Sequence, residues 1–373
     1  CNPMTAIAAD TRLDRQTNLP HRAVGWWLVG IAGMVFVMVV IGALTRLTDS
    51  GLSMVDWRPI TGWLPPMSHE EWQKAFDAYR QFPEYAKINA GMTLFEFQEI
   101  FWLEFIHRVW GRLIGVAFML PLAWFLIRRM VPAAFIPRLI GLLILGGAQG
   151  FMGWYMVKSG LVDRPDVSQY RLTAHLGLAF AIYLALIWTA MDILRPRAAG
   201  LTADSRKLLW TLALVFLTAM SGGFVAGLDA GFTYNTFPLM DGDLIPEGYL
   251  VHDPAWLSIF EDITTVQFNH RLLATITGIV VLFVHGKLPN NMNNPVASLG
   301  VFGGKHDDFT AEWYGNVGSL LCLTMVANIF TPHFEHFFGW CLQKRSRKKA
   351  GTEGGFLTQG GLPLAMHRLA AGL

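Results

Sequence analysis

The sequence has little charge and no strong excess of either sign. Only 15% of its 373 residues are Asp, Glu, Lys or Arg, whereas a soluble domain carries about 25%. The net charge of +2 excludes the basic excess typical of a nucleic-acid-binding protein, so we expect no nucleic-acid partner. It also excludes a disordered chain, which would need few apolar residues and a high net charge.

Cysteine is scarce as well. The three cysteines, Cys1, Cys322 and Cys341, lie far apart, which excludes a CxxC redox or zinc motif. The chain begins at Cys1 instead of Met, so we expect a fragment or a processed form. Residues 1–22 are polar and the first apolar run is too long for a signal-peptide core, so we expect no cleavable signal here.

Apolar residues, by contrast, are abundant. They make up 53% of the chain, and the mean hydropathy is +0.38. A membrane-spanning helix needs about 20 mostly apolar residues. Six runs of this kind, and a weaker seventh, predict an all-α polytopic membrane protein in a lipid bilayer; they cover roughly 24–44, 102–127, 134–157, 172–194, 208–228, 266–285 and, weakest, 314–331.

The loops between these runs predict an orientation. Arginines in the N-terminal segment 1–23 and in the loops near 128–138 and 195–207 favour the cytoplasmic or matrix side. Residues 229–262 hold carboxylates but no Lys or Arg and are expected outside, as are residues 45–98. The aromatic residues of the latter loop predict a short helix on the membrane surface; they are Trp63, Trp72, Phe76 and Tyr79.

An internal repeat relates two parts of the chain. Gly42–Gly51 resembles Gly222–Gly231, and Glu104-Phe-Ile-His-Arg108 resembles Gln267-Phe-Asn-His-Arg271. Because helix, outside loop and His-bearing helix recur in the same order and direction, we predict two tandem four-helix-bundle halves in a parallel repeat. The first half would cover 24–197, and an incomplete second half 206–285, followed by a divergent tail, 286–373, with at most one span.

Three histidines lie inside spans that begin on the outside: His107, His175 and His270. Ionisable residues in membrane spans are costly and are candidates for function. One such histidine could simply be a hydrogen-bonded residue that packs two helices. Three at one depth favour the axial ligation of haem iron from different helices. Zinc is disfavoured, because none of the three has a second ligand at i+3 or i+4.

Glu104 precedes His107 by three residues, so the two share a helix face. Either Glu104 works chemically or it forms an ion pair with Arg108 or Arg112. The matching residue of the second half is Gln267, which suggests one reactive and one supporting half. Arg108 and Arg271 could pair with haem propionates or extend to lipid headgroups. A further signal is a set of glycines that favour close approach of a helix or a flat ligand: Gly42, Gly51, Gly146, Gly147, Gly150 and Gly153.

Several long motifs resemble the haem A synthase family. They are Gly42-Ala-Leu-Thr-Arg-Leu-Thr-Asp-Ser-Gly-Leu-Ser-Met-Val-Asp-Trp-Arg-Pro, Glu104-Phe-Ile-His-Arg-Val-Trp-Gly-Arg, Gln149-Gly-Phe-Met-Gly-Trp-Tyr, Thr173-Ala-His-Leu-Gly, Phe232-Thr-Tyr-Asn-Thr-Phe-Pro and Gln267-Phe-Asn-His-Arg. The resemblance covers about residues 24–284. It is closest to the alphaproteobacterial and mitochondrial class, since the first outside loop has no cysteine pair.

The resemblance implies an eight-helix enzyme that oxidises the C8 methyl of haem O to the formyl of haem A, which cytochrome oxidase uses. It implies that His107 and His175 flank the substrate haem, and that Glu104 is the acidic residue of the oxidation. It also implies that His270 is an axial iron ligand of a haem b cofactor. The expected partners are haem O, haem O synthase and further copies of this chain, with the electron acceptor left open.

The chain departs from the family after about Val284, where the pattern of the last two helices is not found. A fusion, a frameshift or a mispredicted exon would explain this. The spacing between His107 and His175, counted on from His270, reaches the neighbourhood of His336, the one late candidate for a second haem b ligand. Two alternatives stay open: a membrane di-haem cytochrome of the b type that transfers electrons, and a non-catalytic remnant with a broken cofactor half. We expect a bacterial plasma membrane or mitochondrial inner membrane, with the haem sites near the periplasmic or intermembrane-space face.

Overall fold

The computed structural model describes residues 3–58, 61–160, 167–194, 203–234, 236 and 238–286. These residues form helices and connecting loops, with no β-strand beyond one isolated bridge between Met240 and Asp243. Within the described residues, five helices are long and apolar enough to cross a membrane. The chain is therefore an all-α polytopic membrane protein, as predicted.

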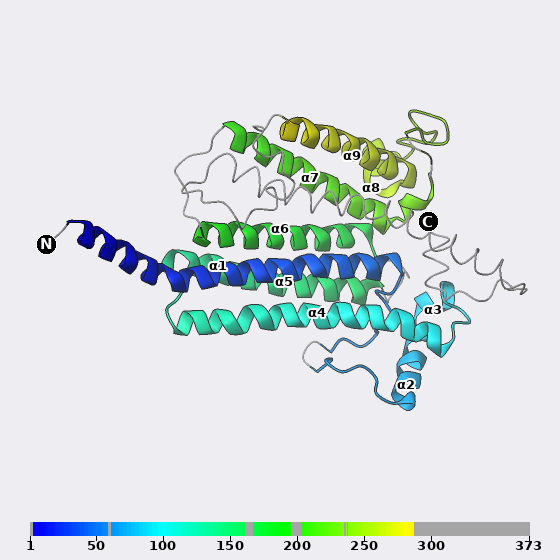
Figure 1. The fold of residues 1–373 in the computed structure, drawn as a ribbon. Helices are drawn as coiled ribbons and strands as arrows, with labels where there is room; N and C mark the ends of the chain where they lie inside the picture. The colour runs from blue at the N-terminus through cyan, green and yellow to red at the C-terminus, as the bar shows by residue number, and fades with distance from the viewer. Residues whose placement is uncertain are drawn as a thin grey trace, which may run out of the picture.

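Four of these long helices form a bundle in which α1 contacts α4 and α6, and α5 contacts the same two helices (Figure 1). Helices α4 and α6 are thus diagonal to each other. Their bounds are α1 Pro3–Leu47, α4 Leu94–Ile127, α5 Ile136–Gly160, preceded by the short 3-10 helix η1 Ala133–Phe135, and α6 Gln169–Leu194. The centre of the bundle is a cluster of buried apolar side chains that includes Val24, Leu28, Leu139 and Leu186.

Two further helices continue the fold beyond α6: α7 (Ala203–Gly227) contacts α6, and α9 (Ile263–Gly286) contacts α7. Glycines of α7 set the spacing to α6. A Cβ added at Gly223 would lie 2.7 Å from Thr173 Oγ1, and one added at Gly227 would lie 2.5 Å from the Gln169 Cα. Small residues allow this close contact of membrane helices.

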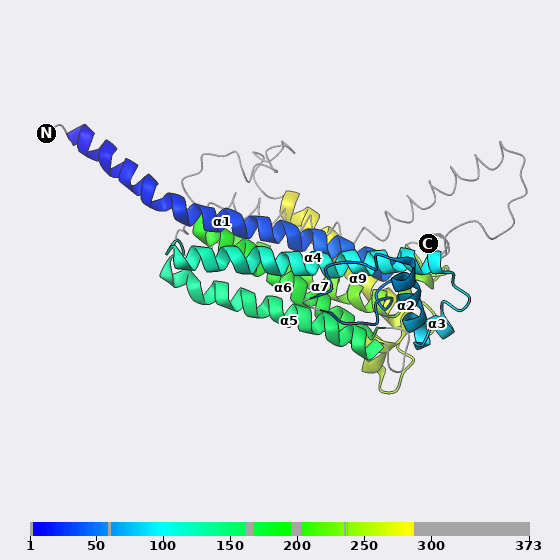
Figure 2. The same ribbon diagram turned by 90° about the horizontal axis from the view of Figure 1, so that it is seen from below.

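The two long loops lie at one end of the molecule (Figures 1 and 2). The first carries α2 (His69–Tyr79) and α3 (Pro83–Lys87); the second carries the 3-10 helices η2 (Ala230–Phe232) and η3 (Ala255–Leu257) and the short α8 (Ser258–Glu261). This agrees with the prediction that residues 45–98 and 229–262 share one side of the membrane. Which side that is stays a prediction.

The expected short helix is present as α2, but its apolar residues do not lie free on a membrane surface. Phe76 and Tyr79 are buried against Phe97 and Phe101 of α4. Helix α4 begins eight residues before the predicted run, at a capping box in which Thr93 and Glu96 exchange hydrogen bonds. This extension supplies the surface that α2 covers.

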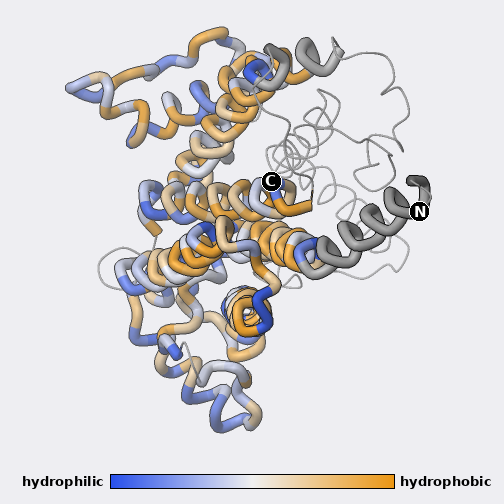
Figure 3. The backbone as a smooth tube through the Cα atoms, turned by 90° about the vertical axis from the view of Figure 1, so that its left-hand side faces the viewer, coloured by the Kyte–Doolittle hydropathy of each residue, from blue (hydrophilic) through white to orange (hydrophobic). Residues whose placement is uncertain are grey.

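The outer faces of the helices are apolar. Figure 3 shows hydrophobic residues around the helices and hydrophilic residues mostly in the loops. Large side chains such as Trp124, Ile144, Phe151 and Trp210 are exposed on these faces. Such an arrangement suits lipid as the surrounding solvent and would be costly in water.

The first five predicted spans are confirmed as membrane-length helices, namely α1, α4, α5, α6 and α7. The sixth run folds as α9, which is not among the five; its first turns hold Gln267, Asn269, His270 and Arg271. The expected polar segment 1–23 is helical from Pro3 onward. The weak run 314–331, like nearly all of the tail 286–373, lies outside the described residues. The division into two four-helix halves stays a prediction.

Candidate functional site

His107 lies on α4 and packs against α1 at a glycine. A Cβ added at Gly42 would be 3.3 Å from its Nε2 atom. The imidazole is half-buried, and the helix begins at the loop end of the bundle. A side chain at Gly42 would therefore displace the ring, so the glycine is part of the space that His107 needs.

His175 lies on α6 and packs in the same way against α5, where a Cβ added at Gly153 would be 3.3 Å from its Cε1 atom. The side-chain nitrogen of Gln149, one turn away on α5, lies 3.2 Å from the ring Nε2 and donates to the carbonyl oxygen of His175 (3.1 Å). The ring Nδ1 is buried and has no hydrogen-bond partner within the described residues. A buried ring nitrogen of this kind suits a site that is completed by a ligand.

These two imidazoles come from diagonal helices of one bundle, α4 and α6. Both lie in the loop-end half of their helices. This arrangement fits a flat group held between two imidazoles inside a helix bundle. That the two rings face each other across one cavity stays a prediction.

Glu104 is buried one turn from His107, and its carboxylate accepts three hydrogen bonds. Its Oε2 accepts from the Ser53 hydroxyl (2.7 Å) and the Met54 backbone N–H (2.6 Å), while Oε1 forms an ion pair with Arg108. The ion pair with Arg108 that the sequence left open is thus present. The carboxylate fastens the loop that follows α1 to the helix that carries His107.

Arg108 also holds the loop that follows α1 against α4. It is buried, donates to the carbonyl oxygens of Met54 (2.7 Å) and Asp56 (3.0 Å), and stacks its guanidinium on Trp57 at 4.9 Å. It therefore does not extend to lipid headgroups, and its pairing with a haem propionate stays a prediction. Its donors are used on the loop.

His270 on α9 packs against a glycine of α7, as a Cβ added at Gly222 would lie 3.1 Å from its Cε1 atom. Here the ring has a side-chain partner as well: Nδ1 lies 2.7 Å from the Ser221 hydroxyl. A histidine that binds a metal through one ring nitrogen usually hydrogen-bonds through the other. This geometry fits His270 as a ligand of haem iron.

Gln267 and Arg271 fasten the second loop just as Glu104 and Arg108 fasten the first. The Gln267 side chain accepts from Tyr234 N–H (3.2 Å) and donates to the Tyr234 carbonyl (2.9 Å). Arg271 donates to the carbonyl oxygens of Thr236 (2.6 Å) and Tyr234. The two loops are thus held on the two His-bearing helices by the same kinds of contact.

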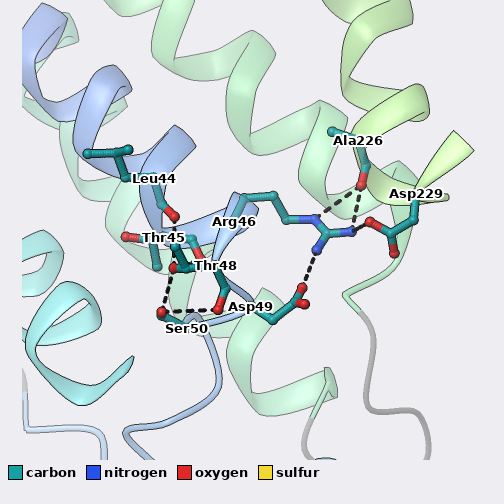
Figure 4. A network of polar contacts seen from close by, with 8 residues as sticks. All are labelled: Leu44, Thr45, Arg46, Thr48, Asp49, Ser50, Ala226 and Asp229. Atoms are coloured by element: carbon teal, nitrogen blue, oxygen red, sulfur yellow. Dashed lines mark hydrogen bonds and ion pairs between the residues drawn. The ribbon is translucent and has the colours of Figure 1, made fainter. Parts of the chain in front are cut away.

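Arg46 joins the ends of α1 and α7 (Figure 4). Its guanidinium pairs with Asp49 (2.8 Å) and Asp229 (2.7 Å) and donates twice to the carbonyl oxygen of Ala226 (2.6 and 3.1 Å). Both aspartates have a φ of 51°, a left-handed conformation that Asp tolerates better than most residues. One cation therefore links the starts of both loops.

Sequence reasoning missed Ser221 and the roles of Arg46 and Gln149, although the last two lie within motifs that it quoted. Of the expected glycines, Gly42 and Gly153 contact imidazoles, whereas a Cβ at Gly146, Gly147 or Gly150 would meet no described atom within 4 Å. His336, the candidate second ligand of haem b, lies outside the described residues.

Comparison with known proteins agrees with this geometry. The profile of the cytochrome oxidase assembly protein family matches residues 25–302. The chain belongs to this family. The match continues past residue 284, where the resemblance was expected to end.

Curated relatives support the same assignment. Haem A synthase of Parvibaculum lavamentivorans is 52% identical over 269 residues, 72% of this chain and 78% of the relative. Haem A synthase of Paramagnetospirillum magneticum is 53% identical over 291 residues, 75% and 80% of the two chains. The mouse protein named haem A synthase COX15 is 47% identical over 278 residues, 70% and 67%. No solved structure is significantly similar to the chain.

Proposed function

We propose that this chain is an oxidoreductase that converts haem O to haem A by oxidising the C8 methyl group to a formyl group. The observation that carries the proposal is the pair His107 and His175. Their imidazoles come from diagonal helices of one bundle, and each packs against a glycine of a neighbouring helix. The relatives named haem A synthase, each about half identical over most of the chain, supply the chemistry that such a haem site would serve.

The substrate haem O would lie between His107 and His175. Gly42 and Gly153 leave room beside the rings, and Gln149 holds His175 in place from the neighbouring helix. Two neutral imidazoles are suitable axial ligands of haem iron. These residues would bind and orient the macrocycle, and the apolar bundle would exclude water from it.

Glu104 would supply the carboxylate that the oxidation requires. Three donors hold this buried carboxylate one turn from His107. A fixed negative charge there would stabilise positive charge that develops on the substrate, or accept a proton from it. The matching residue of the other half, Gln267, makes similar loop contacts without a charge, so the charge is what distinguishes the proposed substrate half.

A haem b cofactor would be held by His270, whose ring is oriented by Ser221 and Gly222. When bound, this haem would supply electron transfer to or from the substrate site. His336 is the candidate for the opposite ligand. We further propose that the haem sites face the periplasm or intermembrane space. We also propose haem O synthase as a partner, because haem O is too apolar to travel freely through water. Further copies of this chain are a second proposed partner.

The test is analysis of the haems bound by the chain. The full chain is expressed with haem O synthase, and the extracted haems are separated by chromatography. Haem A, or its alcohol precursor, is expected and should disappear in His107→Ala and His175→Ala variants. Only haem b and unchanged haem O would contradict the proposal and favour the electron-transfer alternative or a non-catalytic remnant.

A further inference from the structure

Ser221 and Gly222 together form the surface on α7 against which the His270 ring packs. Gly222 is in contact with the ring, and the Ser221 hydroxyl lies 2.7 Å from Nδ1. The hydroxyl also lies 2.7 Å from the carbonyl oxygen of Thr218, to which it donates. A serine hydroxyl has only one hydrogen. Because that hydrogen is used on Thr218, the oxygen accepts a hydrogen from Nδ1 of His270.

This contact determines the tautomer of the imidazole. With the proton on Nδ1, the lone pair that binds iron is on Nε2. The hydrogen bond from Nδ1 also makes the imidazole a more basic ligand and fixes the orientation of the ring. A more basic ligand stabilises the ferric state of haem iron relative to the ferrous state.

The first half has no hydroxyl at the position that matches Ser221. Gly42 packs against His107 as Gly222 packs against His270, but the residue before Gly42 is Ile41, which has no hydroxyl. His175 has Gln149 beside its Nε2, and its Nδ1 has no partner within the described residues. The two halves therefore share the glycine contact and differ in the hydrogen bond to the ligand-like histidine.

We propose that Ser221 is a positioning residue that makes His270 the permanent iron ligand and thereby distinguishes the cofactor half from the substrate half. A cofactor must stay bound through many reaction cycles, whereas a substrate haem must enter and leave. The hydrogen bond to His270 suits a cofactor haem that stays bound. His107, which has Ile41 at the position that matches Ser221, suits a substrate haem that enters and leaves. The inference rests on the proposed haem b site at His270.

The test compares Ser221→Ala with Ser221→Thr, which keeps the hydroxyl, and with Thr218→Val as the matched control. Thr218 lies one turn away on α7 and bonds to Thr277 of α9 (2.7 Å), so its loss removes a hydroxyl contact between the same helices without touching His270. Each full-length variant is purified in detergent and loaded with haem b. The absorption signal that disappears in His270→Ala is assigned to this site.

For this signal, Ser221→Ala should release haem to excess apomyoglobin about tenfold faster, the lower end of the effect of losing a ligand-orienting partner. If the ferric form loses tenfold more affinity than the ferrous form, the midpoint potential rises by about 59 mV. Ser221→Thr and Thr218→Val should behave like the parent. Equal effects in Ser221→Ala and Thr218→Val, or no effect in Ser221→Ala, would overturn the inference. If no signal depends on His270 in the parent chain, the proposed cofactor site itself is wrong.

Discussion

Arg108 and Arg271 each donate to two backbone carbonyls of the loop that covers their helix, and the two pairs of carbonyls lie at matching positions. Arg108 binds Met54 and Asp56, and Arg271 binds Tyr234 and Thr236. In each case the arginine directly follows the histidine proposed to bind haem. The loop and the imidazole are therefore fixed by neighbouring residues of one helix, so a change in the loop would be transmitted to the proposed haem site.

Glu104→Gln should separate the charge of this residue from its structural role. Gln267 shows that an amide can hold the equivalent loop, so Glu104→Gln should fold and bind haem O while haem A formation falls at least tenfold. Glu104→Ala should also lose about 3–5 kcal/mol of stability, because it leaves Arg108 buried without its partner. Haem chromatography and thermal unfolding measure the two effects.

Gln267→Glu is the matched control for Glu104→Gln, since it adds a carboxylate at the equivalent place beside His270, the proposed cofactor ligand. Haem A formation should stay at the parental rate in Gln267→Glu if Glu104 alone is the reacting acid. Haem A formation at the parental rate in Glu104→Gln would show that the carboxylate only fastens the loop.

Gly42→Ala should disturb His107 directly. The new methyl would lie 3.3 Å from Nε2 of the ring, closer than an ordinary contact, so the ring must move. We expect haem O to bind about tenfold more weakly, as when a ligand is misoriented. Gly33→Ala on the same helix is the control, because a Cβ there meets no described atom within 4 Å. Equal haem O affinity in the two variants, measured by optical titration, would count against His107 as a ligand.

Arg46→Ala should loosen the connection between the two groups of helices. The substitution removes the hydrogen bonds from the guanidinium to the Ala226 carbonyl. A hydrogen bond from a charged donor contributes about 1.5–3 kcal/mol. The substitution also removes two partly exposed ion pairs, which contribute little to stability. Because both bonds share one acceptor and Arg46 is partly exposed, we expect about 2 kcal/mol lower stability by thermal unfolding. Arg138→Ala, which removes a more exposed arginine from its pair with Asp192, should cost at most about 1 kcal/mol. A larger loss in Arg138→Ala would refute this account of Arg46.

Much of the fold was predictable, because long apolar runs specify membrane helices almost independently of context. The repeated Glu/Gln-x-x-His-Arg motifs likewise predicted which helices carry histidines. The sequence could not show that Arg108 turns its donors to Met54 and Asp56, since loop carbonyls carry no sequence signal. Nor could it pair Arg46 with Asp229, because such distant contacts depend on how α1 and α7 end beside each other. Ser221 was overlooked because hydroxyls are common in membrane helices.

His336→Ala tests whether the tail completes the cofactor site. Only α7 and α9 of the predicted second half lie within the described residues, and the sequence predicts that the tail lacks the pattern of the family's last two helices. We therefore expect the tail to supply no second axial histidine opposite His270. His336→Ala should then leave the His270-dependent haem spectrum unchanged, whereas His270→Ala abolishes it. A spectrum that changes from six-coordinate to five-coordinate in His336→Ala would contradict this prediction. It would identify His336 as the second axial ligand, and the tail as a divergent replacement for the missing helices.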